Sequence, residues 1–148
     1  MLKLTIMSKT KVPSWFKITV ILAVLWNLAG IFSFFLEITL TQEYISGLPA
    51  AEQALLNHTP LWTNIAFALG VYGGAIGSIG LLIQKAWARL PLLISLIAVF
   101  LQMSYWLFFT TAVEVYGSGT YIMPVSVILI AYLLFSLCNK GIKKGYIT

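Results

Sequence analysis

The chain has 148 residues, of which 60% are hydrophobic and 9% are charged, whereas about 25% are charged in ordinary soluble domains. A soluble domain this short leaves much of its surface in water, so the composition excludes a soluble protein and indicates one domain embedded in lipid. The net charge of +5 does not predict a nucleic-acid partner, because the basic residues flank apolar runs, as membrane proteins arrange them.

Four charge-free apolar runs are long enough to span a bilayer, which takes about 20 helical residues. They cover residues 18–36, 61–83, 90–113 and 121–138. The runs are continuous rather than alternating, which favours helices over strands. We therefore predict an all-α, up-down bundle of four transmembrane helices. The expected helices run approximately over residues 15–37, 61–84, 90–113 and 121–139.

Charges outside the runs predict the orientation. All nine lysines and arginines precede the first run, lie between the second and third, or follow the fourth. The other two connections hold every acidic residue, namely Glu37, Glu43, Glu52 and Glu114. The positive-inside rule then places both termini in the cytoplasm and residues 38–60 outside.

The exterior loop, residues 38–60, is expected to contain a short helix over residues 49–56. Pro49 suits the first helical position and Glu52 the first turn. We interpret this helix as an ordered connector, with a place on the bilayer surface as the alternative. Residues 114–120 contain two glycines and are expected to form a tight turn.

The second run has small residues along one side of the expected helix, and neighbouring helices can approach such a face closely. The favoured interpretation is packing within the chain, and the alternatives are homodimerisation or a cleft floor. The glycines concerned are Gly70, Gly73, Gly74, Gly77 and Gly80.

Ionisable side chains are absent from the interior of every run, which argues against proton relays and ion-coupled pumps. The chain has one histidine, His58, and one cysteine, Cys138. Neither a metal site nor a nucleophile and base can be assembled from them in the membrane. We expect no enzymatic activity, no cofactor and no metal.

Neutral polar residues do lie near the middle of the runs. Amide groups are costly in lipid, so these side chains are expected to face the bundle interior. The favoured interpretation is hydrogen bonding between helices, and the sharper hypothesis is a site for a neutral solute. The candidate solute-binding residues are Asn27, Tyr72, Gln102, Tyr105 and Tyr132.

Several segments carry a resemblance to a known family. They are residues 25–30, 48–62, 70–80, 96–103 and 114–117. In these segments the chain resembles a family of small four-helix bacterial membrane proteins often labelled "sugar transporter". The resemblance implies a bacterial inner-membrane location and favours transport, but carries over no binding or catalytic residue.

Two functional hypotheses follow. The first is a small carrier for neutral solutes such as sugars, acting as a homodimer. The second is an accessory or scaffolding subunit whose glycine face docks a larger membrane protein. A polar path at mid-depth would favour the first, and a fully packed bundle with an exposed glycine face would favour the second.

Overall fold

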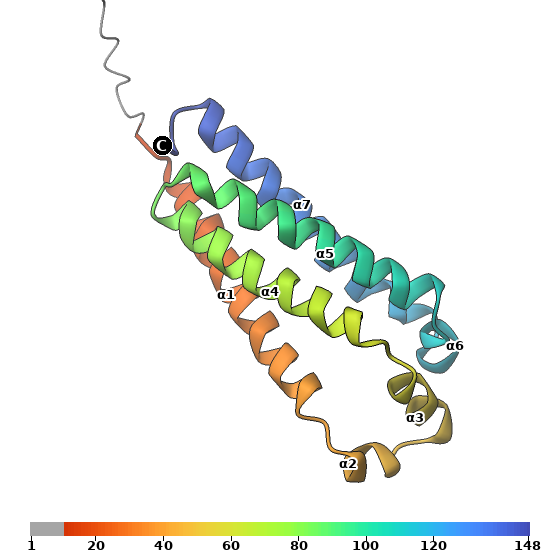
Figure 1. The fold of residues 1–148 in the computed structure, drawn as a ribbon. Helices are drawn as coiled ribbons and strands as arrows, with labels where there is room; N and C mark the ends of the chain where they lie inside the picture. The colour runs from red at the N-terminus through yellow and green to blue at the C-terminus, as the bar shows by residue number, and fades with distance from the viewer. Residues whose placement is uncertain (1–10) are drawn as a thin grey trace, which may run out of the picture.

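The computed structural model describes residues 11–148, and every regular element in that range is helical (Figure 1). The predicted all-α four-helix bundle is confirmed. The four long helices are α1 (Ser14–Ile38), α4 (Leu61–Leu82), α5 (Arg89–Phe108) and α7 (Ile122–Lys143). The shorter elements are α2 (Gln42–Ser46), α3 (Ala50–Asn57), η1 (Ala86–Ala88), α6 (Ala112–Tyr116) and η2 (Ser118–Tyr121).

All four long helices are long and apolar enough to cross a membrane, as in a multi-pass membrane protein. Each satisfies its own backbone hydrogen bonds, which a lipid environment requires. Proline precedes two of them, with Pro13 before α1 and Pro60 before α4. A proline there loses no helical hydrogen bond, because the first amides of a helix have no partner in it.

The third long helix ends earlier than the sequence predicted. Helix α5 stops at Phe108. The last two residues of the apolar run, 112 and 113, belong to a separate short helix, α6. The Thr110 hydroxyl donates to the Trp106 carbonyl at 2.5 Å and accepts from the Ala112 amide at 3.2 Å. Threonine side chains that bond locally compete with the helical backbone in this way. The predicted tight turn over residues 114–120 is replaced by the end of α6 and by η2.

The predicted short helix in the first loop is present as α3. Pro49 is its N-cap residue rather than its first helical residue. A second short helix in the loop, α2, was not predicted. The Thr41 hydroxyl caps it by accepting from the Tyr44 amide at 3.2 Å, as threonine commonly does at a helix start.

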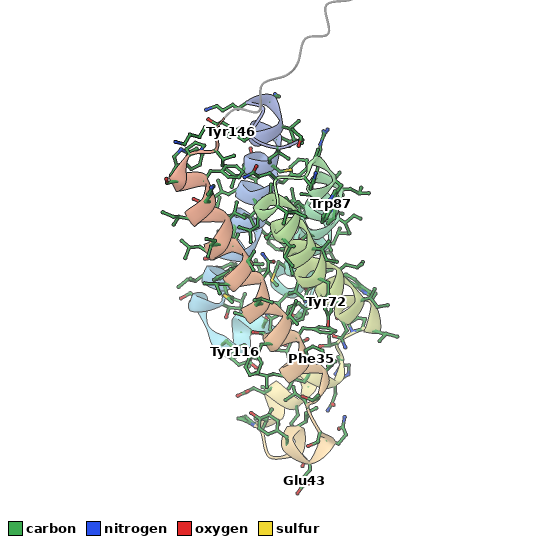
Figure 2. The ribbon with its side chains drawn as sticks, turned by 90° about the vertical axis from the view of Figure 1, so that its left-hand side faces the viewer. Phe35, Glu43, Tyr72, Trp87, Tyr116 and Tyr146 are labelled. Carbon is green, nitrogen blue, oxygen red and sulfur yellow. The ribbon has the colours of Figure 1, made fainter. Side chains whose placement is uncertain are left out.

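The two ends of the bundle differ in charge. Within the described range, residues 11–148, the lysines and arginines lie at the end of the bundle that holds the C-terminus. We call this the basic end. The opposite end, with α2, α3 and α6, holds the acidic residues and is called the acidic end. Figure 2 shows Tyr146 at the basic end and Glu43 at the acidic end. Lys3 and Lys9, which the orientation prediction also uses, lie outside the described residues.

A buried apolar cluster closes the basic end, and we call it the basic-end core. It joins all four long helices, η1 and the chain terminus, through Phe16, Val20, Ala23, Leu81, Ala88, Leu92, Leu134, Cys138 and Ile147. Backbone hydrogen bonds of Thr148 strengthen this end. The Thr148 amide donates to the Gln84 carbonyl at 3.0 Å, and the Thr148 carbonyl accepts from the Ala86 amide at 3.1 Å. From this core, α1 and α7 diverge toward the acidic end (Figure 1).

Candidate solute-binding cavity

The glycines of α4 are covered by other helices of the same chain. A Cβ atom added at Gly70 would lie 2.8 Å from the Val99 side chain of α5. One at Gly73 would lie 2.9 Å from the Pro91 carbonyl of α5. Gly77 faces α5, Gly80 faces η1 and Gly74 faces Asn27 of α1. The small residues therefore let α4 lie close to its neighbours, which leaves this face unavailable to a second chain.

A cavity of about 840 Å³ lies between the four long helices. Its inner end meets the basic-end core, because Leu92 and Leu134 belong to both. Its other end reaches the loops of the acidic end, including Thr59, Tyr116 and Thr120. The cavity is not enclosed: α1 bounds one side and α7 the other, while α4 and α5 form the floor. Its volume lies in the range of small-molecule pockets, about 300–1,000 Å³.

Two polar side chains at mid-depth, Asn27 and Ser95, donate hydrogen bonds to other groups of the protein. The Asn27 amide donates to the Ala23 carbonyl at 2.8 Å and to the Ser78 hydroxyl of α4 at 3.3 Å. The Ser95 hydroxyl of α5 donates to the Gly70 carbonyl at 2.6 Å. Both side chains line the cavity and are buried. They hold α1 and α5 against α4, which is the hydrogen bonding between helices that the sequence favoured.

Gln102 differs from Asn27 and Ser95. It lines the cavity from α5, and its buried Oε1 atom has no hydrogen-bond partner among the described residues. A buried carbonyl without a donor costs about 1–3 kcal/mol, which a ligand or a water molecule in the cavity can recover. Gln102 is therefore a mid-depth amide with an unpartnered acceptor in the cavity.

The three candidate tyrosines do not share one environment. Tyr105 lines the cavity, and the centroid of its ring lies 5.0 Å from the ring centroid of Trp62 in an edge-on arrangement. Tyr72 and Tyr132 are 38% and 56% exposed and do not line the cavity. The expectation that they face the bundle interior is wrong. A tyrosine tolerates an outward position because its ring is apolar and its hydroxyl can reach a polar partner.

Known proteins offer no guide to this cavity. The chain matches no family model, no curated protein and no solved structure. The resemblance described from the sequence therefore stays a prediction, and the site has to be interpreted from its own residues.

The charge of the cavity lining is one-sided. Among the described residues, Glu37 in the last turn of α1 is the only aspartate or glutamate in the lining, and no lysine, arginine or histidine lines the cavity. The sequence placed Glu37 at the margin of the first helix and did not select it as a site residue. A pattern in the sequence could have identified Glu37 as a lining residue. Glu37 shares one helix face with three other lining residues, because the spacings are four, three and four residues along Trp26, Gly30, Ser33 and Glu37.

The end of the cavity at the acidic-end loops, near Thr59, Tyr116 and Thr120, is called its mouth. A polar contact joins two of the short helices there. The Tyr116 hydroxyl of α6 donates to Oε2 of Glu52 in α3 at 3.3 Å, and Tyr116 also lines the cavity. Burial raises the pKa of Tyr116, and the negative charge and hydrogen bond of Glu52 raise it further, with a smaller effect of Tyr44. Tyr116 thus stays a neutral donor above the ordinary pKa range of tyrosine.

Candidate metal ligands do not gather within residues 11–148, where no three His, Cys, Asp or Glu side chains form a group. His58 is exposed in the loops, with Nδ1 at 2.7 Å from the Ala54 carbonyl. Cys138 is buried in the basic-end core. The cavity lining itself offers apolar contacts, the unpartnered Oε1 of Gln102 and the carboxylate of Glu37.

Proposed function

We propose that this protein binds a small solute in the cavity and carries it across the membrane. The observation that supports the proposal is the cavity itself, which reaches the loops of the acidic end, meets the basic-end core at the other end and is not enclosed by the helices. A carrier in one of its two access states has this form. By the positive-inside rule the acidic end faces the exterior, so this is the outward-accessible state of an inner-membrane protein.

The alternative, an accessory subunit, has less support. It depended on an exposed glycine face in a fully packed bundle, whereas the glycines are covered by α5, η1 and α1. The homodimer expected from the sequence stays a prediction, because the helices of one chain line the cavity without enclosing it.

The lining favours an apolar or amphipathic solute over a sugar. Asn27 and Ser95 already use their donor groups within the protein, and the buried Oε1 of Gln102 offers an acceptor. A sugar at this depth would leave most hydroxyls without partners, each at a cost of about 1–3 kcal/mol. An apolar body held by few hydrogen bonds meets no such cost.

Carriage requires the basic-end core to open, and the native Cys138 reports on it. Cys138 is the only cysteine of the chain and is buried in that core. In vesicles with known orientation, we expect a membrane-impermeant maleimide to label Cys138 slowly from the basic side. The control is Cys138→Ser/Thr120→Cys, whose new thiol lies in the mouth and should be labelled from the acidic side.

A further variant tests whether the protein opens its basic-end core only when the cavity is closed at the acidic end. In a chain with both Cys138 and Thr120→Cys, a bulky maleimide added first at the mouth should hold the cavity in its present state. Labelling of Cys138 from the basic side should then slow several-fold relative to the untreated protein. If Cys138 is never labelled in the folded protein but reacts fully after unfolding, the protein does not carry a solute through this core.

A further inference from the structure

We infer that the ligand of the cavity is an organic cation with an apolar body, its positive group at Glu37 and its body directed inward along α1 toward Asn27. This inference rests on the proposed binding function of the cavity and specifies the ligand class. The argument has three independent parts, which are the charge of the mouth, the character of the walls and the geometry of α1.

The charge of the mouth selects a cation. Within residues 11–148, no lysine, arginine or histidine lines the cavity beside Glu37. The lysines and arginines of residues 11–148 lie at the opposite end of the bundle, so they neither pair with Glu37 nor attract an anion to this end. The other acidic residues, Glu43, Glu52 and Glu114, lie at the same end and add to the negative potential there.

The walls suit a hydrophobic body attached to that cation. The floor formed by α4 and α5 is apolar and is lined by Phe67, Val71, Val99 and Met103. Two tryptophans also line the cavity, Trp26 and Trp106. Aromatic faces attract organic cations through their ring electrons, by about 0.5–2 kcal/mol. Methionine adapts its shape to irregular ligands. A strongly hydrated inorganic cation would gain nothing from these walls.

The geometry of α1 relates the charge to the depth of the cavity. Glu37 and Asn27 are both lining residues of α1, ten residues apart. At a rise of about 1.5 Å per residue, the cavity extends about 15 Å inward from the carboxylate. A ligand in this position has its charge near the end of a membrane-spanning helix and its apolar part at membrane depth. Amphiphilic molecules take the same orientation in a bilayer.

The test measures binding of probes that share a shape and differ in charge. The full-length protein is placed in phosphatidylcholine nanodiscs, and binding to empty nanodiscs is subtracted. The probes are tetraphenylphosphonium, the anion tetraphenylborate of the same shape, and neutral triphenylphosphine oxide. We expect saturable binding of the phosphonium, at least about tenfold weaker binding of the neutral probe, and no saturable binding of the borate.

Three variants locate the interaction. Glu37→Gln keeps the size of the side chain and should weaken phosphonium binding about tenfold, with little effect on the neutral probe. Glu43→Gln removes the same charge from the same end but not from the lining, and should change binding by less than about twofold. Val127→Trp fills the α7 side of the cavity and should reduce binding of every probe. Circular dichroism and thermal unfolding confirm that each variant is folded.

Each remaining outcome decides the matter. Equal phosphonium binding by wild type and Glu37→Gln, or equal binding of the cation and the neutral probe, overturns the inference. If the neutral probe still binds and Val127→Trp abolishes it, the cavity binds a solute and only the ligand class is wrong. Absence of phosphonium binding also overturns the inference, whereas carriage is decided separately by the labelling of Cys138, which needs no ligand.

Discussion

Asn27 of α1 and Ser78 of α4 form a buried hydrogen bond across the helix pair, with 3.3 Å between the amide nitrogen and the hydroxyl oxygen. Ser78 is 0% exposed, and the Asn27 side chain fills the space left by the missing side chain of Gly74. The contact thus combines a polar link with close backbone approach. It anchors α1, which diverges from α7 beyond this point and forms one side of the cavity.

Asn27→Ala should destabilise the protein by about 1 kcal/mol, because it removes the link and leaves the buried Ser78 hydroxyl without this partner. The measurement is unfolding of the purified protein by a denaturing detergent. Ser78→Ala should cost a similar amount, and the double variant should cost clearly less than the sum of both. Additive effects would show that the two side chains do not act as a pair.

Gln102→Leu should leave stability unchanged or raise it by about 1 kcal/mol, because Oε1 has no partner to lose. The same substitution should weaken binding of any ligand that donates a hydrogen bond at this depth. The two measurements together separate a solute contact from a structural role. Loss of folding in Gln102→Leu would mean that the amide supports the bundle rather than a ligand.

Gly74→Ala should destabilise the protein by about 1–3 kcal/mol, because the added methyl group would collide with the Asn27 side chain. The matched control is Gly119→Ala in the second loop, where nothing lies within 4 Å of an added Cβ. That control should change stability by less than about 0.5 kcal/mol. Thermal unfolding of both variants checks the difference, and equal effects would contradict the close packing of α1 on α4.

Alkaline pH should weaken the contact between Tyr116 and Glu52. The pKa of Tyr116 is raised in the folded protein above its ordinary value of 10.0. The bond therefore stabilises the fold below that ordinary value, and its contribution is lost as the pH rises through the folded pKa. In an ultraviolet titration, Tyr116→Phe should remove a late-ionising tyrosine from the absorbance change.

Glu52→Gln provides the control for the cause of this pKa shift. It should lower the pKa of Tyr116 only in part, since burial is the larger cause and stays in place. A Tyr116→Phe titration that loses an early-ionising tyrosine instead would contradict the hydrogen bond of Tyr116 to Glu52.

The residues at mid-depth show where prediction from the sequence stopped. Asn27 and Gln102 were selected correctly as lining residues, because an amide is costly in lipid and turns inward. The same argument failed for Tyr72 and Tyr132, because tyrosine loses little by facing outward. Glu37 was passed over because its place at the end of a run indicated only the membrane boundary.

What the sequence determined by itself is the presence of the four long helices and which of their connections lie at the same end of the bundle. Continuous apolar runs in lipid have to satisfy their own backbone, and this local requirement needs no knowledge of neighbours. The tertiary structure alone decided that α4 is covered on its glycine face, that α1 and α7 diverge, and that Glu37 and Gln102 line one cavity. These features depend on the rotation and tilt of each helix, which are set by packing between side chains far apart in the chain.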